Sequence, residues 1–125
     1  MKLLDQLFIL DEIDESENGF EAVLQTNPEH LIYAAHFPGN PITPGVCIIQ
    51  IANELLEKQL GKRLFLKTIK NVKFLSVIIP AEGKKIKYAF SGIAETEMGY
   101  KTQVVVSDET MVYAKMSLIF GYELV

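Results

Sequence analysis

The chain has 125 residues, 49% of them hydrophobic, and a formal net charge of -4 at neutral pH. This length supports one core, so we expect residues 1–125 to form a single domain. The negative charge argues against nucleic-acid binding. The lone Cys47 excludes an internal disulfide, and no apolar stretch is long enough to span a membrane. We therefore expect a cytoplasmic protein with no membrane partner.

The first segments in chain order predict two strands and a short helix. Residues 8–13 and 19–26 have strand-like patterns, and the acidic residues between them predict a turn. Residues 29–35 predict one helical turn, which leads into a proline-rich loop.

The segment 45–60 predicts the long helix of the chain. Thr43 and Pro44 are typical of an N-cap followed by a first-turn proline, and Gly61 is a natural C-terminal stop. The first half of the helix has aliphatic side chains on every face, so we expect other structure to surround it.

Four strand-like segments follow, at residues 64–79, 84–94, 100–107 and 111–122. Apolar and polar side chains alternate in them, and turn-like sequences separate them. Short turns between successive strands predict an antiparallel meander. The whole order predicts an α+β fold in which one antiparallel sheet wraps around one central helix.

A histidine precedes the long helix. The first N–H groups of a helix lack intrahelical partners and carry partial positive charge. A histidine beside them can move a proton while those N–H groups stabilise a developing oxyanion. We therefore interpret His36 as catalytic and the N–H of Gly45 as an oxyanion donor. The alternatives are a structural loop histidine and a glycine needed only for packing.

The run HFPGNPITPGVCII, residues 36–49, resembles the signature of the 3-hydroxyacyl-acyl-carrier-protein dehydratases of fatty-acid synthesis, which are FabZ/FabA-like and have the hotdog fold. The stretch NVKFLSVIIPAEG, residues 71–83, resembles the next strand and turn of that family. The resemblance implies that His36 acts as a general base or acid and that the N–H of Gly45 polarises the thioester carbonyl. It also implies a site shared by two subunits and acyl carrier protein as the partner that carries the substrate. No metal cluster or nucleotide motif is present in the sequence, so we expect no cofactor.

One position departs from the family pattern. The family carries an acidic residue fourteen positions after the histidine, and here that position holds Gln50. A glutamine cannot exchange a proton at neutral pH, although it can orient a hydroxyl or a water. Glu54 lies one helical turn further on, where many family members carry glutamine. It is either a displaced acid acting through water or, as we favour, a solvated residue.

The resemblance also gives a set of side chains expected to contact the substrate, namely Phe37, Pro44, Val46 and Glu54. Cys47, among aliphatic residues, is expected to serve packing rather than catalysis.

Three functions stay open at this point. The first is dehydration of a 3-hydroxyacyl thioester to the trans-2-enoyl thioester, in fatty-acid or polyketide-type synthesis. The second is a catalytically impaired partner subunit, or an acyl-thioester binding module, because Gln50 replaces the acid. The third is thioester hydrolysis on the same fold. We expect a homodimer or higher oligomer, or a heterodimer with an active homologue.

Basic residues are concentrated in one part of the sequence. Nine of the twelve Lys and Arg residues lie between positions 62 and 101. They form either a docking surface for the acidic carrier protein or a set of solvated strand faces.

Overall fold

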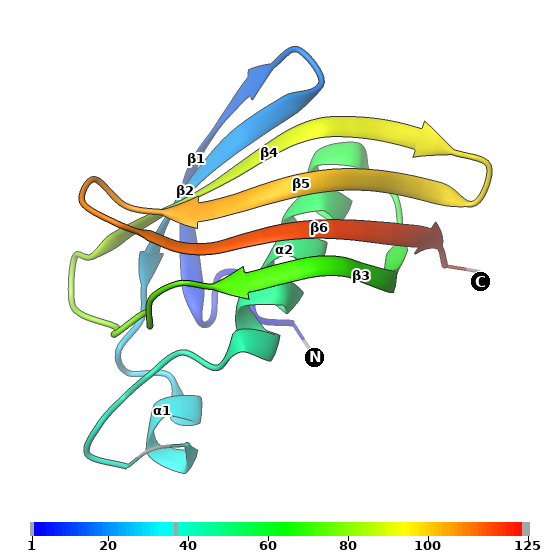
Figure 1. Ribbon diagram of the computed structural model, residues 1–125. Helices are drawn as coiled ribbons and strands as arrows, with labels where there is room; N and C mark the ends of the chain where they lie inside the picture. Colours follow the sequence, from blue (N-terminus) through cyan, green and yellow to red (C-terminus); the bar gives the residue numbers. More distant parts are fainter. Residues whose placement is uncertain (1, 37, 124–125) are drawn as a thin grey trace.

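The computed structural model describes residues 2–36 and 38–123, which form one antiparallel sheet and two helices (Figure 1). The strands are β1 Phe8–Ser16, β2 Gly19–Thr26, β3 Leu64–Phe74, β4 Lys85–Thr96, β5 Gly99–Ser107 and β6 Val112–Tyr122. The helices are α1 Leu31–Ala35 and α2 Gly45–Leu60. The sheet curves around α2, while α1 lies beyond one end of it (Figure 1). The predicted α+β arrangement is thereby confirmed.

The strand order is β1-β2-β4-β5-β6-β3. β4, β5 and β6 form the predicted meander, but the prediction that β3 belongs to it as a neighbour of β4 is wrong. The connection over residues 75–84 is too long for a hairpin turn, so it carries the chain across to the other part of the sheet. β3 therefore pairs with β6 and forms an open edge.

The core lies between the sheet and one face of α2. Alternate side chains of β4 point inward, and Tyr88 among them is fully buried. Its hydroxyl donates a hydrogen bond of 2.9 Å to the carbonyl of Ile48 and so joins the sheet to the helix. Burial raises the pKa of the Tyr88 hydroxyl well above its ordinary value. On α2, Ile51 and Leu55 are completely buried, and each contributes about 1.5–3 kcal/mol of hydrophobic stabilisation.

α2 begins and ends at the predicted residues, but its N-cap residue differs from the prediction. Pro44 occupies the N-cap position, and no side chain caps the helix there. The prediction that Thr43 is the cap is wrong, because its hydroxyl is hydrogen-bonded with the hydroxyl of Tyr33 at 2.8 Å. At the other end, Gly61 adopts a left-handed conformation with φ 66, as its position predicts.

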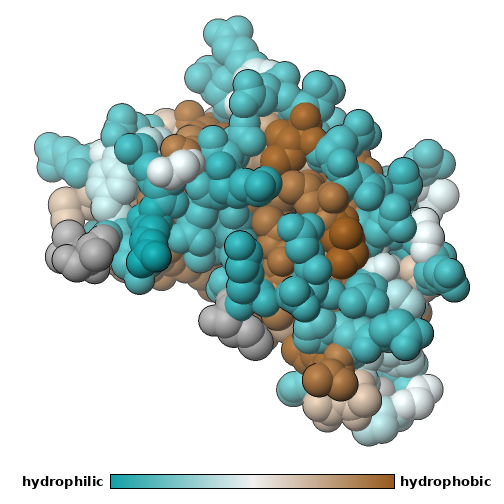
Figure 2. All heavy atoms as spheres, turned by 180° about the vertical axis from the view of Figure 1, so that it is seen from behind, coloured by the Kyte–Doolittle hydropathy of each residue, from teal (hydrophilic) through white to brown (hydrophobic). Residues whose placement is uncertain are grey.

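One face of α2 is left partly uncovered by the described part of the chain. Val46 on this face is 75% exposed, and Ile49, Gln50 and Asn53 are partly buried. Spacings of three and four residues place them on the same side. The prediction that other structure surrounds this half of the helix is therefore wrong for a single chain. Figure 2 shows the molecule from behind, where apolar surface gathers in one area bordered by hydrophilic side chains.

The helices within residues 2–36 and 38–123 include none that is long and apolar enough to cross a membrane.

Candidate active site

His36 directly follows α1, a helix of five residues. The start of α1 is capped by His30, whose Nδ1 accepts a hydrogen bond of 3.1 Å from the N–H of Ile32. The N–H of His36 donates to the carbonyl of Ile32 at 2.8 Å, which fixes its backbone. Its side chain is exposed, so the imidazole can exchange protons with solvent or with a ligand. Phe37, an expected substrate contact, lies outside the described residues.

The N-terminus of α2 presents N–H groups. The N–H groups of Cys47 and Ile48 donate to the carbonyl of Pro44 at 3.0 and 3.2 Å. Within the described residues, the N–H groups of Gly45 and Val46 have no acceptor. These two donors can stabilise negative charge on a ligand oxygen. Pro44 is partly buried and Val46 is exposed beside them, where both can contact a ligand.

Gly45 is in close contact with an aromatic ring of β3. A Cβ atom at position 45 would lie 2.8 Å from Cζ of Phe74, closer than a real Cβ approaches another atom. A larger residue would displace this half-exposed ring. The packing role considered for Gly45 is therefore present, and it is compatible with an oxyanion role because the N–H is a backbone group.

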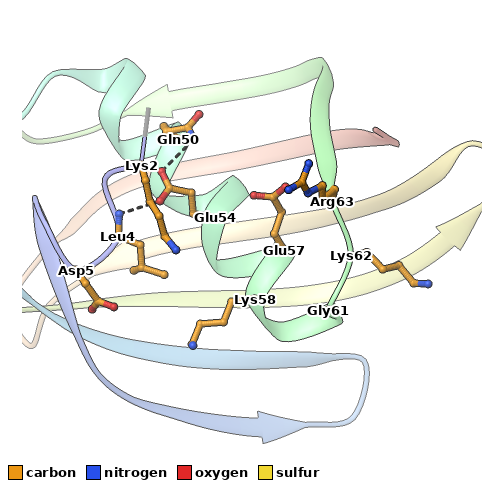
Figure 3. Close-up of a pocket in the computed structure, with 10 residues that line it drawn as sticks. All are labelled: Lys2, Leu4, Asp5, Gln50, Glu54, Glu57, Lys58, Gly61, Lys62 and Arg63. Atoms are coloured by element: carbon orange, nitrogen blue, oxygen red, sulfur yellow. Dashed lines mark hydrogen bonds between the residues drawn. The ribbon is translucent and has the colours of Figure 1, made fainter. Parts of the chain in front are cut away.

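Glu54 lies one turn after Gln50 and is only 7% exposed. Its carboxylate accepts hydrogen bonds from the N–H of Leu3, at 3.0 and 2.9 Å to its two oxygens, and from the N–H of Leu4 at 2.9 Å. The Nε2 of Gln50 donates to its Oε2 at 3.0 Å (Figure 3). The expectation of a solvated Glu54 is therefore wrong. The N-terminal segment crosses the helix here, and its buried N–H groups need an acceptor.

A polar groove of about 590 Å³ runs along this part of α2 (Figure 3). Gln50, Glu54 and Glu57 line it from the helix, with Asp5 from the N-terminal segment. Its carboxylates are all bound to backbone N–H groups, since Glu57 accepts from Leu64 at 2.9 Å and Asp5 accepts from Leu10 at 2.9 Å. Four cationic side chains also line it, namely Lys2, Lys58, Lys62 and Arg63. No carboxylate of a described residue lies within 4.0 Å of any of these four.

The residues expected in one site do not all meet within one chain. The groove contains Gln50 and Glu54 but not His36, Pro44, Gly45 or Val46. Among the described residues, no hydrogen bond joins the side chain of His36 to Gln50. α1 extends away from the sheet (Figure 1).

The basic residues that cluster in the sequence separate in the fold. Lys85 and Lys87 on β4 lie 3.5 and 3.8 Å from Asp11 on β1 and Glu21 on β2. Lys67, Lys70 and Lys73 are exposed on β3, at the opposite part of the sheet. The nine therefore do not form one continuous surface within this chain, and Lys67, Lys70 and Lys73 form one exposed group on β3.

Cys47 is buried, as expected for a packing residue. Burial raises the pKa of its thiol, which opposes formation of the nucleophilic thiolate. Within the described ranges, no group of three or more His, Cys, Asp or Glu residues is placed to hold a metal ion.

A sequence model for the family described as ApeI-like, ApeI dehydratase, matches residues 12–115. The chain belongs to this family. The resemblance noted in the sequence and the expected hotdog fold are both confirmed for this ApeI-like chain.

Relatives of the ApeI-like chain carry dehydratase names. The 3-hydroxyacyl-[acyl-carrier-protein] dehydratase FabZ of Lactobacillus helveticus is 30% identical over 122 residues, covering 90% of this chain and 82% of that enzyme. FabZ of Clostridium acetobutylicum is 32% identical over 90 residues, covering 65% of this chain and 64% of that enzyme. A chain of the dehydratase heterocomplex ApeI:P from Xenorhabdus doucetiae has the same fold, with a TM-score of 0.76, 17% identity and coverage of 91% and 97%.

Sequence reasoning on the ApeI-like chain missed one part of the groove, the binding of Leu3 and Leu4 to Glu54. The sequence signal that could have revealed this contact was the place of Glu54 directly before Leu55 and Leu56, which are core residues. An acidic residue so close to the buried face of a helix needs donors, but the sequence does not say from where they come.

Proposed function

We propose that this chain removes water from a 3-hydroxyacyl thioester carried on acyl carrier protein, giving the trans-2-enoyl thioester. The observation that carries the proposal is an exposed His36 on the loop that leads into a helix with two available N–H groups. The FabZ names of the relatives favour dehydration over hydrolysis of the thioester.

In this proposal His36 removes a proton from C2, and the N–H of Gly45 stabilises the charge on the thioester oxygen. The C3–O bond breaks, the C2–C3 double bond forms, and the hydroxyl leaves as water. Gln50 cannot supply the proton that the leaving hydroxyl takes. That proton comes from His36, directly or through a water that Gln50 holds. Loss of a positioned acid costs on the order of 10²–10⁴ in rate, so we expect slow turnover.

Two copies of the chain would complete the site. Within one copy, Gln50 lies in the groove and His36 does not. The uncovered face of α2 offers an apolar contact through Val46. β3 is an open edge whose Phe65 and Ile69 are exposed, and such an edge favours pairing with another strand. These features support a dimer with the site between the subunits.

The substrate carrier is proposed to dock near β3. Lys67, Lys70 and Lys73 are exposed there, and no described carboxylate lies within 4.0 Å of them. Acyl carrier protein is acidic, so these cations at a sheet edge can steer it to the site.

A second function is favoured by Gln50 itself, which cannot act as the acid of the family. In it, the chain supplies His36 to a heterodimer whose other subunit supplies a carboxylic acid. One structural neighbour is described as a heterocomplex, which gives this arrangement a precedent on the same fold.

The test is an absorbance assay for the enoyl thioester, using purified protein and a 3-hydroxyacyl thioester on acyl carrier protein. Turnover that His36→Ala abolishes supports the dehydratase. Turnover only after a homologous chain with Glu or Asp at the position of Gln50 is added supports the partner subunit. Release of free thiol without enoyl product would overturn both in favour of hydrolysis.

A further inference from the structure

We propose that Glu54 is a positioning residue for Gln50, so that these two side chains act as one unit in the site. The catalytic part of this inference rests on the function proposed above. Glu54 is buried, and its carboxylate accepts a hydrogen bond of 3.0 Å from the amide nitrogen of Gln50. It is itself fixed by the N–H groups of Leu3 and Leu4.

The first consequence concerns which atom Gln50 offers to a ligand. A side-chain amide has an NH2 group with two donors and a carbonyl oxygen that accepts, and Glu54 accepts a hydrogen bond from the NH2 group. The carbonyl oxygen of Gln50 is turned away from Glu54 (Figure 3). A carbonyl oxygen has two lone pairs and accepts hydrogen bonds only. A carbonyl oxygen held in this orientation can accept a hydrogen bond from the O–H of a 3-hydroxyacyl chain or of a water.

The second consequence concerns which residue can stand at position 50. A glutamate there would bring a second carboxylate to about the distance of the present hydrogen bond, and two such charges cannot both ionise without cost. Neighbouring charges lie on every element around the pair and comprise Lys2, Asp5, Glu57, Lys58, Lys62 and Arg63. Five of these six residues stay unchanged in the variants below. The sixth, Glu57, is substituted only in the control.

The experiment is a double-mutant cycle on the full chain, with urea unfolding followed at pH 7.5 and at pH 5. Gln50→Glu should raise the unfolding equilibrium constant on the order of tenfold at pH 7.5. A shared proton raises the folded-state pKa of the new pair above its unfolded value. The stability of this variant relative to wild type should therefore recover as the pH falls toward the carboxyl pKa of the unfolded chain.

In Gln50→Glu/Glu54→Gln, the hydrogen bond reforms with its direction reversed, so the pH-dependent loss should disappear. Adding Glu57→Gln to Gln50→Glu is the matched control, because Glu57 is a groove carboxylate that also binds a backbone N–H. It should leave the loss in place. If Gln50→Glu caused the same loss with and without Glu54→Gln, the proposal would be overturned.

The activity arm uses the enoyl-thioester assay on the same proteins. Glu54→Gln should lower kcat on the order of 100-fold, because the amide of Gln50 loses its fixed orientation. The same double-mutant cycle should show coupling between positions 50 and 54 in the dependence of kcat on pH. The kcat of Gln50→Glu should therefore change when Glu54 is replaced by glutamine. Turnover absent from every variant would count against the proposed function, while the stability cycle would still decide the pairing.

Discussion

At the scale of single residues, the chemistry of this chain depends on contrasts in exposure. His36 is exposed on a loop and can exchange protons, whereas Cys47 and Glu54 are buried on α2. Burial makes Glu54 a hydrogen-bonded anchor and makes Cys47 a poor nucleophile. A thiol and a carboxylate can both react in a suitable environment, so the surroundings of each side chain decide whether it can take part.

Cys47 gives a direct test of this contrast. Burial raises the pKa of its thiol, so at pH 8 the folded protein holds less thiolate than the unfolded chain does. We expect the folded protein to react with a thiol-specific disulfide reagent more slowly than the urea-unfolded protein, by on the order of 100-fold or more. The rate should increase with pH. Equal rates in the two states would show that the thiol is accessible and that its packing role is wrong.

At the scale of elements, local pattern located the strands and the long helix but not how they associate. The helix 45–60 was predictable because Pro44 and Gly61 bracket one apolar run. The place of β3 beyond β6 was not, since no local signal in residues 75–84 states which edge the chain reaches. The cap at Thr43 failed for the same reason, as its hydroxyl bonds with Tyr33 rather than with the helix.

Non-local contacts also explain why two glycines face each other across β5 and β6. Gly99 pairs with Gly121, and a Cβ at Gly99 would lie 2.0 Å from the carbonyl oxygen of Phe120. A Cβ at Gly121 would in turn meet the ring of Phe65 on β3 at 2.6 Å. The close approach of three strands therefore depends on residues without side chains.

We expect Gly99→Ala to lower the free energy of unfolding by about 3 kcal/mol, because backbone must move to admit the methyl group. The measurement is urea denaturation followed by circular dichroism. Lys101→Ala on the same strand is the control, since its side chain is exposed and should change stability by less than about 0.5 kcal/mol. Similar values for the two variants would mean that β5 and β6 are not packed this closely.

At the scale of the whole molecule, the candidate site is divided. The sequence places His36, Gly45 and Gln50 within one short stretch, yet the groove of a single chain holds only the last of them. The features that would unite them are an uncovered helix face and an open strand edge, both suited to a second copy. Sequence reasoning could name these residues because they lie close together in the sequence. Their separation in space depends on the path of the chain between the two helices.

Subunit complementation tests this division. His36→Ala and Gln50→Leu should each impair turnover when alone, because every site then lacks one of the two groups. Mixed under conditions that allow subunit exchange, half of the dimers pair one variant with the other, and each of these contains one intact site and one doubly defective site. Activity should therefore return to about one quarter of the wild-type rate. If both groups belonged to a site within one chain, mixing would restore nothing, and the site would have to be sought where the loop of His36 closes on its own helix.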